Sequence, residues 1–518
     1  MEIPDQSFGN IALSLSGGGY RAAAFHLGTL EMLNELGLLS SVTILSTVSG
    51  GTITGMAFAL ADMSGEDAFN SVKNLLYDFM LFGGKNVITA ALSQLEPSSH
   101  INNDDFMPSV IRAAASIYAS PKLFGEKTFD ALPVAGSRLR EISFNATDFR
   151  NGSSFRFQKS AGGFAPSGSD HAAIPPGRVL EAVRLADIVA ASSCFPGGFE
   201  PLRFPSDFVW TDPALSYVQT ALKDNFGEIP LMDGGVFDNQ GIDSILNVLH
   251  RQNVLADLLI VSDTTHRAST LLEFPTAPRR RGISLRSIAI LLIAAFICSI
   301  VTIGAFLQEL CESIANGGPG WFRGTFMFGF PLGLSILTAV LLAGAGWGWW
   351  WASRLTYEKT GVKLWRDAGK LTIPQIIDLI GGRVKSVLVM TSSVFMGRIR
   401  ALGFDRVYTD PNIRPTVMPN LIYDLDNSPL WGKEIVDRKL SPSDHLRTVA
   451  KQAESFPTTL RIEKDELDNL ILCGRATTCF KVIKYLLQHR ADKIDDGVSP
   501  EFHLFSHATN IWKDLNRR

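Results

Sequence analysis

The sequence predicts an α/β protein with a central, mostly parallel sheet covered by helices on both faces, and a two-helix transmembrane hairpin attached to it. Three observations support this fold class. Residues 8–268 alternate short apolar segments with amphipathic ones, which is typical of a parallel sheet between two layers of helices. Glycine-rich turns follow several of the expected strands. Further along the chain, two long apolar stretches have the length that crosses a bilayer.

We expect three parts. Residues 8–268 form the α/β domain, residues 279–354 form the hairpin, and residues 355–518 form a C-terminal α/β extension that packs on the first domain. The expected strands of the first domain are 11–16, 43–48, 141–145, 229–232 and 258–262. In the extension we expect a strand at 386–390 and helices at 442–454 and 476–489.

Charge and cysteine content exclude several classes of function. The formal net charge is −3 and the charged residues are interspersed, so no basic surface for nucleic acid is expected. The five cysteines show no C-x-x-C spacing, which predicts a reducing compartment, no metal site and no redox motif. The first ten residues contain acidic side chains and no apolar stretch, so no secretory signal is expected there.

The first strand runs into a glycine turn, residues 17–21 (GGGYR), and then into a helix. Such a turn leaves backbone N–H groups free to face a dinucleotide pyrophosphate or the oxyanion of an acyl-transfer intermediate. Gly17, Gly19 and Ala22 match the spacing of the dinucleotide fingerprint, which also requires an acidic residue at the end of the next strand. The next strand ends without one, so we favour the oxyanion interpretation and expect no cofactor.

The second strand ends in a turn that resembles a nucleophile elbow, where a sharp strand-to-helix turn exposes a serine. The residues are Ser49, Gly50 and Gly51, and the two glycines allow a close backbone approach. The full pattern is G-x-S-x-G, and this chain has Thr47 at the first glycine position. Taken alone, the segment is equally compatible with an ordinary Ser-Gly-Gly loop.

A serine hydroxyl is a weak nucleophile until a base accepts its proton. None of the nine histidines lies in a recognisable motif. Asp233 follows the strand at 229–232 and precedes Gly234 and Gly235, so its carboxylate can approach the same edge of the sheet as Ser49. Asp-Gly alone is also a common turn. The other carboxylates considered for this role are Asp187, Asp238 and Asp263.

These three turns, taken in order, resemble the motifs of the patatin-like phospholipase family. The resemblance covers approximately residues 8–245, and residues 190–196 (AASSCFP) are similar to the family's segment before the aspartate strand. Residues 456–460 are similar to the extension of larger bacterial members. The resemblance implies a three-layer α/β/α hydrolase domain.

The resemblance also implies roles for individual residues. Ser49 and Asp233 would form a catalytic dyad. The oxyanion hole would be formed by amides from Gly17, Gly18, Gly19 and Gly50. The supporting residues would be Arg21, Gly51, Gly234 and Gly235. The chain departs from the family beside the hole, because Ala22 replaces a frequent glycine and Ser16 a frequent acidic residue.

The hairpin is expected to have spans at about 288–307 and 326–351, joined by a turn at 317–320. Basic residues flank the two spans on their outer sides, and the intervening loop carries only Arg323. The flanking basic residues are Arg279, Arg280, Arg281, Arg286, Arg354, Lys359, Lys363 and Arg366. The positive-inside rule therefore places the hydrolase domain and both termini on the cytoplasmic side of an integral membrane protein. Two buried core helices of a soluble protein are the alternative.

The function implied is that of a membrane-anchored serine lipid acyl hydrolase of the phospholipase A or lysophospholipase type, acting through an acyl-enzyme. Its substrate would be a phospholipid or another acyl-ester lipid. The sequence leaves triacylglycerol lipase and acyltransferase open, and protein partners are not identified by any motif. The alternative from another class is a catalytically inactive lipid-binding or scaffolding membrane protein with the same fold.

Overall fold

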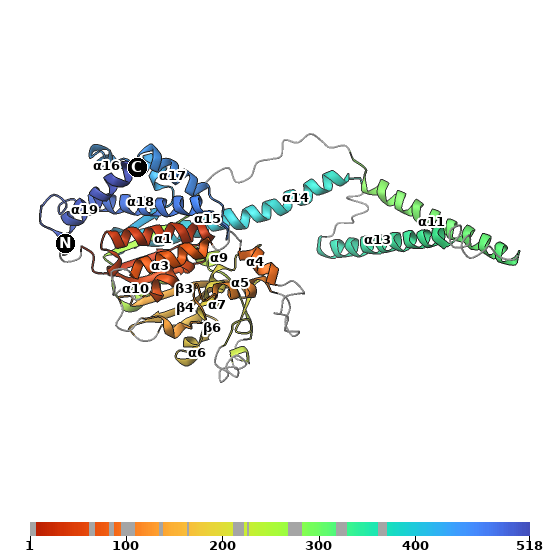
Figure 1. Ribbon diagram of the computed structural model, residues 1–518, viewed down its shortest axis with the longest axis horizontal. Helices are drawn as coiled ribbons and strands as arrows, with labels where there is room; N and C mark the ends of the chain where they lie inside the picture. Colours follow the sequence, from red (N-terminus) through yellow and green to blue (C-terminus); the bar gives the residue numbers. More distant parts are fainter. Residues whose placement is uncertain are drawn as a thin grey trace. The chain divides into compact units, whose positions relative to one another are not determined.

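A ten-stranded sheet forms the centre of the larger part of the chain (Figure 1). The computed structural model describes residues 7–61, 68–81, 87–94, 109–133, 138–162, 165–210, 222–224, 227–267, 282–316, 329–360 and 370–517. Contacts divide the chain into two units, Met1–Ser269 with Ser393–Arg518, and Thr270–Ser392. The sheet belongs to the first unit, so the C-terminal residues complete the fold that the N-terminal residues begin.

Five neighbouring strands of this sheet are parallel, in the order β10-β9-β1-β2-β3. They are β10 (Val417–Leu421), β9 (Leu258–Asp263), β1 (Ile11–Leu15), β2 (Val42–Val48) and β3 (Glu141–Asp148). Antiparallel strands continue the sheet: β4 (Ser153–Ser160), β5 (Ser167–Ser169) and β6 (Ala172–Ile174). The mostly parallel sheet is confirmed, and each of the five strands expected in the α/β domain is present.

Strand β8 (Ile229–Asp233) occupies an unusual place in this sheet. It pairs antiparallel with Ala146, Thr147 and Asp148 of β3. Strand β4 pairs with one edge of β3 along its whole length. Strand β8 therefore pairs with the opposite edge, which β2 occupies as far as Asn145. Therefore β2 and β8 run toward each other along one edge of β3, and their carboxyl ends meet.

Helices cover both faces of the sheet, as predicted. One face packs against α1 (Gly19–Glu35), α2 (Gly50–Leu60), α7 (Leu185–Ser193) and α18 (Lys464–His489). The other face packs against α10 (Ile242–Gln252) and α15 (Met396–Thr409). The strands alternate between these layers: Leu13 lies in the first core and Ala12 in the second.

The remaining elements of the first unit surround this core. They are α3 (Ala68–Met80), α4 (Val87–Gln94), α5 (Val110–Tyr118), α6 (Arg178–Glu181), β7 (Leu202–Phe204), α9 (Gly235–Asp238), α16 (Lys433–Asp437), α17 (Asp444–Ser455) and α19 (Pro500–Arg517). Helices α17 and α18 confirm the two helices expected at 442–454 and 476–489.

The C-terminal part docks closely on the first helix. In Figure 1 the blue α18 runs beside the red α1. An ideal Cβ on Gly474 would lie 2.0 Å from the backbone oxygen of Phe25, and one on Gly28 would lie 2.1 Å from that of Ile471. The two helices therefore touch backbone to backbone, which only glycine permits.

The strand expected at 386–390 is wrong, because these residues lie in α14 (Ile373–Val389) and at the start of a π-helical turn (Met390–Phe395). Thr372 and Gln375 form a capping box that starts α14. A short apolar run does not distinguish a strand from a helix by periodicity alone, and here the capped start decides for the helix.

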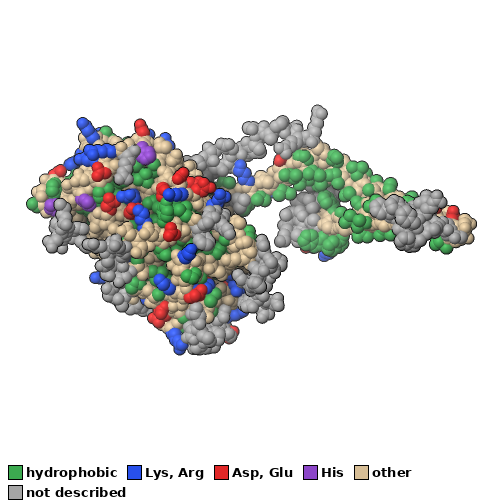
Figure 2. All heavy atoms as spheres, in the orientation of Figure 1, with side chains coloured by type: hydrophobic (Ala, Val, Ile, Leu, Met, Phe, Trp, Pro, Cys, Tyr) green, Lys and Arg blue, Asp and Glu red, His purple; other side chains and the backbone are tan. Residues whose placement is uncertain are grey.

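The second unit contains two long apolar helices, α11 (Leu285–Ala315) and α13 (Phe330–Thr360), which pack against each other. Leu285–Glu312 and Leu332–Trp351 are long and apolar enough to cross a membrane, and only 6% and 0% of their most apolar windows are buried. Hydrophobic side chains cover the visible surface of these helices (Figure 2). Low burial argues against the core helices of a soluble protein. The expected turn at 317–320 and the basic residues at 279–281 lie outside the described residues.

Candidate active site

Ser49 lies on the sharp turn between β2 and α2. Its backbone has φ 52° and ψ −121°, which is a strained conformation for a residue with a side chain. The following glycines explain how the turn closes. An ideal Cβ would lie 2.0 Å from the Gly19 oxygen if placed on Gly50, and 2.5 Å from the Leu15 oxygen if placed on Gly51. This is the geometry of a nucleophile elbow, with Thr47 accommodated within β2.

Asp233 ends β8 and faces Ser49. The Ser49 hydroxyl donates a hydrogen bond to the Asp233 carboxylate, and the Gly235 N–H donates another to its Oδ1 at 2.7 Å. Ser49 and Asp233 are both buried, with 6% of each residue exposed. Burial raises the pKa of Asp233 to about 6, although both hydrogen bonds act in the opposite direction. The carboxylate is therefore ionised at neutral pH and basic enough to accept a proton.

Ser192, at the end of α7, joins the two halves of this site. Its Oγ accepts the Ser49 N–H at 2.9 Å and donates to the Asn145 carbonyl at 2.7 Å. Its own carbonyl accepts the Gly234 N–H at 3.2 Å. Sequence reasoning missed Ser192 as a site residue. The family-like segment at 190–196 was the signal that could have found it.

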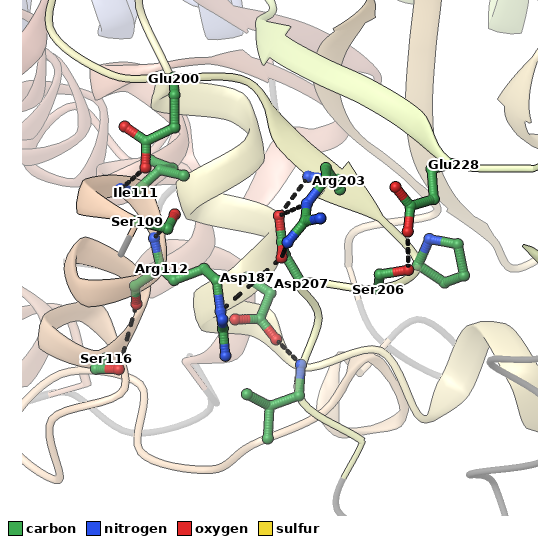
Figure 3. A network of polar contacts seen from close by, with 12 residues as sticks. Ser109, Ile111, Arg112, Ser116, Asp187, Glu200, Arg203, Ser206, Asp207 and Glu228 are labelled. Carbon is green, nitrogen blue, oxygen red and sulfur yellow. Dashed lines mark hydrogen bonds and ion pairs between the residues drawn. The ribbon is translucent and has the colours of Figure 1, made fainter. Parts of the chain in front are cut away.

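The strand that carries Asp233 is held by a polar network (Figure 3). Arg203 of β7, which pairs with β8, contacts Asp207 at 2.8 Å. Ser206 donates to Glu228 at 2.7 Å, one residue before β8 begins. Asp187 of α7 accepts the N–H of Val209 at 2.8 Å. These contacts fix α7 and β8 relative to each other from outside the dyad.

The other carboxylates considered as bases are engaged elsewhere. Asp187 forms a buried ion pair with Arg184 at 2.7 Å. Asp238 accepts three backbone N–H groups of the turn that follows it. Asp263 faces Arg400 at 3.7 Å. Asp233 is the one among these carboxylates that reaches Ser49.

Two helix N-termini converge beside Ser49. Gly18 and Gly19 begin α1, and Gly50 begins α2. The first amides of a helix have no acceptor within the helix, and they carry the positive end of its dipole. Among the hydrogen bonds of the described residues, the amides of Gly18, Gly19 and Gly50 have no acceptor. They suit an oxyanion.

Gly17 does not belong to this set, which corrects the sequence-based assignment. Its N–H donates to the Asn239 carbonyl at 2.9 Å, so it is already occupied. Gly17 is required for space instead: an ideal Cβ would lie 2.5 Å from Asn239 Oδ1 and 3.2 Å from the Ser49 Cβ. Asn239, which is 4% exposed, is a second site neighbour that the sequence did not indicate.

Arg21 links the glycine turn to the C-terminal part of the chain. Its guanidinium donates to the Phe456 carbonyl at 2.8 Å and to Thr458 Oγ1 at 3.2 Å. The neighbouring Tyr20 N–H donates to the Thr459 carbonyl at 2.8 Å. Burial lowers the pKa of Arg21 to about 10, so it remains charged at neutral pH. Arg21 and Tyr20 thus connect the glycine turn to residues 456–460.

Comparison with known proteins relates one part of this chain to a family. Residues 13–246 match the model of the patatin-like phospholipase family, a range that contains Ser49, Asp233 and both glycine turns. Human GIVD cytosolic phospholipase A2 is similar in structure, with 16% identity, a TM-score of 0.33, and coverage of 50% of this chain and 46% of that chain. VipD from Legionella pneumophila has 11% identity and a TM-score of 0.22, with coverage of 98% of this chain and 90% of that chain. The chain thus spans just under half the length of the human enzyme. No curated protein matches the sequence.

Proposed function

Because residues 13–246 form a patatin-like phospholipase domain, we propose that this chain is a membrane-anchored serine lipid acyl hydrolase that uses a Ser49–Asp233 dyad. The observation that carries the proposal is the buried hydrogen bond between Ser49 and Asp233 beside three amides without acceptors. A nucleophile, a base and oxyanion donors are the three groups that acyl transfer requires.

The reaction would proceed in two stages. In the first, Asp233 accepts the Ser49 proton while Oγ attacks the ester carbonyl, and the amides of Gly18, Gly19 and Gly50 stabilise the oxyanion. Asp233 then gives the proton to the leaving alcohol oxygen, which leaves an acyl-enzyme. In the second stage a water molecule loses its proton to Asp233 and attacks the acyl carbonyl. Collapse of this intermediate returns the proton to Ser49 and releases the fatty acid.

We propose a phospholipase A or lysophospholipase, with an acyl glycerophospholipid as substrate. The support is the apolar hairpin, because a site tethered to a bilayer meets its lipid substrate at high local concentration. We infer that residues 8–268 make up the catalytic part together with the C-terminal residues Ser393–Arg518, which belong to the same unit, and that residues 279–354 anchor it. Both termini and the hydrolase domain would lie on the cytoplasmic side.

Fatty-acid release from mixed phospholipid vesicles by the detergent-purified full chain tests the proposal. Ser49→Ala is expected to remove nearly all activity, and Asp233→Asn to lower the rate constant by about 10³-fold or more. Matched controls are Ser116→Ala and Asp437→Asn, which alter exposed residues outside the site. These controls should retain wild-type rates.

Two results would contradict the proposal. Fatty-acid release that survives in Ser49→Ala would assign the activity to another nucleophile. A wild-type protein that binds vesicles and releases no fatty acid from any ester lipid would favour the lipid-binding scaffold. Mass analysis of the released lipids names the acyl position in the active case.

A further inference from the structure

Helix α14 of the second unit carries a stripe of apolar side chains along one side. Five of its residues follow one another at alternating intervals of four and three residues, which places them on one face of a helix. They are Ile373, Ile377, Ile380, Val384 and Val387. Between 43% and 63% of each of these residues is exposed. The described part of the chain therefore leaves the stripe uncovered.

The opposite side of α14 is polar. Asp378, Gly382 and Lys385 lie on it, about half a turn around the helix from the stripe. Charged side chains are costly inside a hydrocarbon core, and α14 is not among the two described helices that are apolar enough to cross one. Helix α14 is therefore amphipathic and is not a third span.

The start of α14 is hydrogen-bonded to the start of α11. The Leu285 N–H donates to the Leu371 carbonyl at 3.0 Å. The Ile373 N–H donates to the Ile283 carbonyl at 3.2 Å. Leu285 is also the first residue of the first candidate span. Both helices therefore begin at one place, where the proposed hairpin enters the membrane, and the stripe begins there too.

Helix α14 needs a surface that covers its stripe. Gly381 and Gly382 lie in its interior, and nothing lies within 4 Å of an ideal Cβ on either. Glycine makes a helix less stable than alanine does, and no packing constraint requires glycine here. Most helices in proteins are stabilised by burial of an apolar face. The stripe is the face that α14 has for this purpose.

A second copy of α14 fits the stripe less well than a lipid surface does. The spacing is that of a coiled coil, in which charged residues of both signs beside the apolar seam pair with the partner helix. Here the positions beside the seam hold one cation, Arg383, and no carboxylate. The pattern also extends over about two heptads, whereas coiled coils sustain it over three or four. A cation beside an apolar stripe suits the anionic headgroups of a bilayer.

We infer that α14 lies along the surface of the lipid bilayer, with the stripe in contact with acyl chains and Lys385 facing water. The inference rests on the proposed membrane anchor, because it takes the start of α11 as the membrane surface. In sequence, α14 is the last helix of the second unit before the chain re-enters the first unit. The chain is thus held at the bilayer by an interfacial helix in addition to the hairpin.

Fluorescence quenching by brominated lipids tests the position of the stripe. The two exposed cysteines are removed from the full chain by Cys298→Ala and Cys311→Ala, and one cysteine is introduced by Ile380→Cys or by Ser386→Cys. Each protein is labelled with an environment-sensitive fluorophore and reconstituted into vesicles of phosphatidylcholine and phosphatidylglycerol with brominated acyl chains. We expect the label at position 380 to be quenched at least threefold more than the label at position 386. Aqueous iodide should give the reverse order.

A pair of charge substitutions tests the stripe itself. Ile377→Glu with Val384→Glu, added to the protein labelled at position 380, should at least halve the quenching by brominated lipids. Gly382→Glu with Ser386→Glu is the matched control, because it adds the same two charges to the opposite side of α14. The control should leave the quenching unchanged. Equal quenching in both pairs would contradict the role of the stripe.

A label on the native Cys298, in a chain with Cys311→Ala, reports on the hairpin separately, because Cys298 lies within the first candidate span. Quenching at position 298 without quenching at position 380 would overturn the interfacial helix and leave the anchor intact. Quenching at neither position would overturn both. Blue-shifted emission at position 380 without quenching by brominated lipids would show that a protein surface covers the stripe, which also overturns the inference.

Discussion

Ser49 and Asp233 meet because two strands end at the same point from opposite directions. Val48 lies opposite Asn145 of β3, and Asp233 lies opposite the next residue, Ala146. Ser49 and Asp233 are thus positioned by the pairing of two strands with β3. A site held by strand ends keeps its geometry without a third catalytic residue to orient the base.

The pH dependence of activity follows from the pKa of Asp233. Only the ionised carboxylate accepts the Ser49 proton, and its pKa is about 6. We therefore expect kcat/KM on a short-chain soluble ester to rise with pH, to be half-maximal near pH 6 and to level off above it. An initial-rate profile from pH 4.5 to 8.5 measures this. A profile that is flat across pH 6 would be inconsistent with Asp233 as the base.

The free energy of unfolding should also depend on the Asp233 carboxylate, but it should decrease as pH rises, whereas activity increases. Its pKa is raised from 3.8 in the unfolded chain to about 6 in the folded one, so between these values the folded state binds more protons. Stability therefore falls as pH rises through this window, and Asp233→Asn relieves the penalty. We expect the free energy of unfolding of the variant to exceed that of the wild type at pH 8 by up to about 3 kcal/mol, with a higher melting temperature, and we expect little difference at pH 4. Equal melting temperatures at both pH values would refute the buried charge.

Ser192 should matter for rate without touching substrate. Ser192→Ala leaves the buried Ser49 N–H without the acceptor that now lies 2.9 Å away. An unsatisfied buried donor costs about 1–3 kcal/mol of folding free energy, and here it would destabilise the strained turn that carries Ser49. We expect kcat to fall about 10- to 100-fold with KM little changed. The matched control is Ser193→Ala, whose hydroxyl donates to the Val189 carbonyl within its own helix. Equal effects of both substitutions on kcat would show that Ser192 has no special role.

At the scale of elements, the starts of α1 and α2 form one structural unit. Their backbones touch, because an ideal Cβ on Gly50 would lie 2.0 Å from the Gly19 oxygen and 2.9 Å from the Gly19 nitrogen. Residues 456–460 hold the start of α1 from the outside through Tyr20 and Arg21. The amides proposed as oxyanion donors therefore depend on a segment more than four hundred residues away in the chain.

Gly50→Ala tests the contact between these helix starts. The new methyl group cannot fit, so the two turns must separate. The amides of Gly18, Gly19 and Gly50 would then no longer point toward the same oxyanion. We expect kcat to fall about 10²- to 10³-fold, as for the loss of an oxyanion donor. Gly381→Ala in α14 is the matched control, since nothing lies within 4 Å of its ideal Cβ. Wild-type activity in Gly50→Ala would exclude Gly50 from the site.

Local pattern was sufficient to predict the five strands of the α/β domain and the glycine turns that follow β2 and β8, whereas it gave a strand at 386–390 where α14 lies. Each of these glycine turns depends on an apolar run followed by glycines, which a single sequence displays. The direction of β8 could not be predicted, because strand direction depends on pairing with β3 and not on the residues of β8 itself. Ser192 was missed for the same reason: its partners, Ser49 and Asn145, lie 143 and 47 residues away. The occupied Gly17 amide likewise depends on Asn239, far along the chain.

At the scale of the whole molecule, the chain leaves the first unit and returns to it. Residues Thr270–Ser392 form the second unit, and Ser393–Arg518 rejoin the first, where β10 adds the edge strand of the sheet. Helix α15, which precedes β10 in the chain, packs on the sheet through Val407. The second unit therefore divides the first unit in sequence and not in structure, and the core of the first unit stays continuous.

Membrane attachment can be tested through the apolar helices themselves. Ile297 and Leu337 are 55% exposed, and both lie within the candidate spans. An arginine at the centre of a span costs about 2.5–3.5 kcal/mol of insertion free energy, so Ile297→Arg with Leu337→Arg should move the protein from the membrane pellet to the soluble fraction after an alkaline wash. Activity on vesicles should fall at least tenfold, while activity on a soluble short-chain ester should persist, because the dyad lies in the other unit. The matched control, Ile297→Leu with Leu337→Ile, should stay in the pellet. Recovery of the wild-type chain in the soluble fraction would show that these helices do not anchor it, and the exposed apolar surface would then require a protein partner.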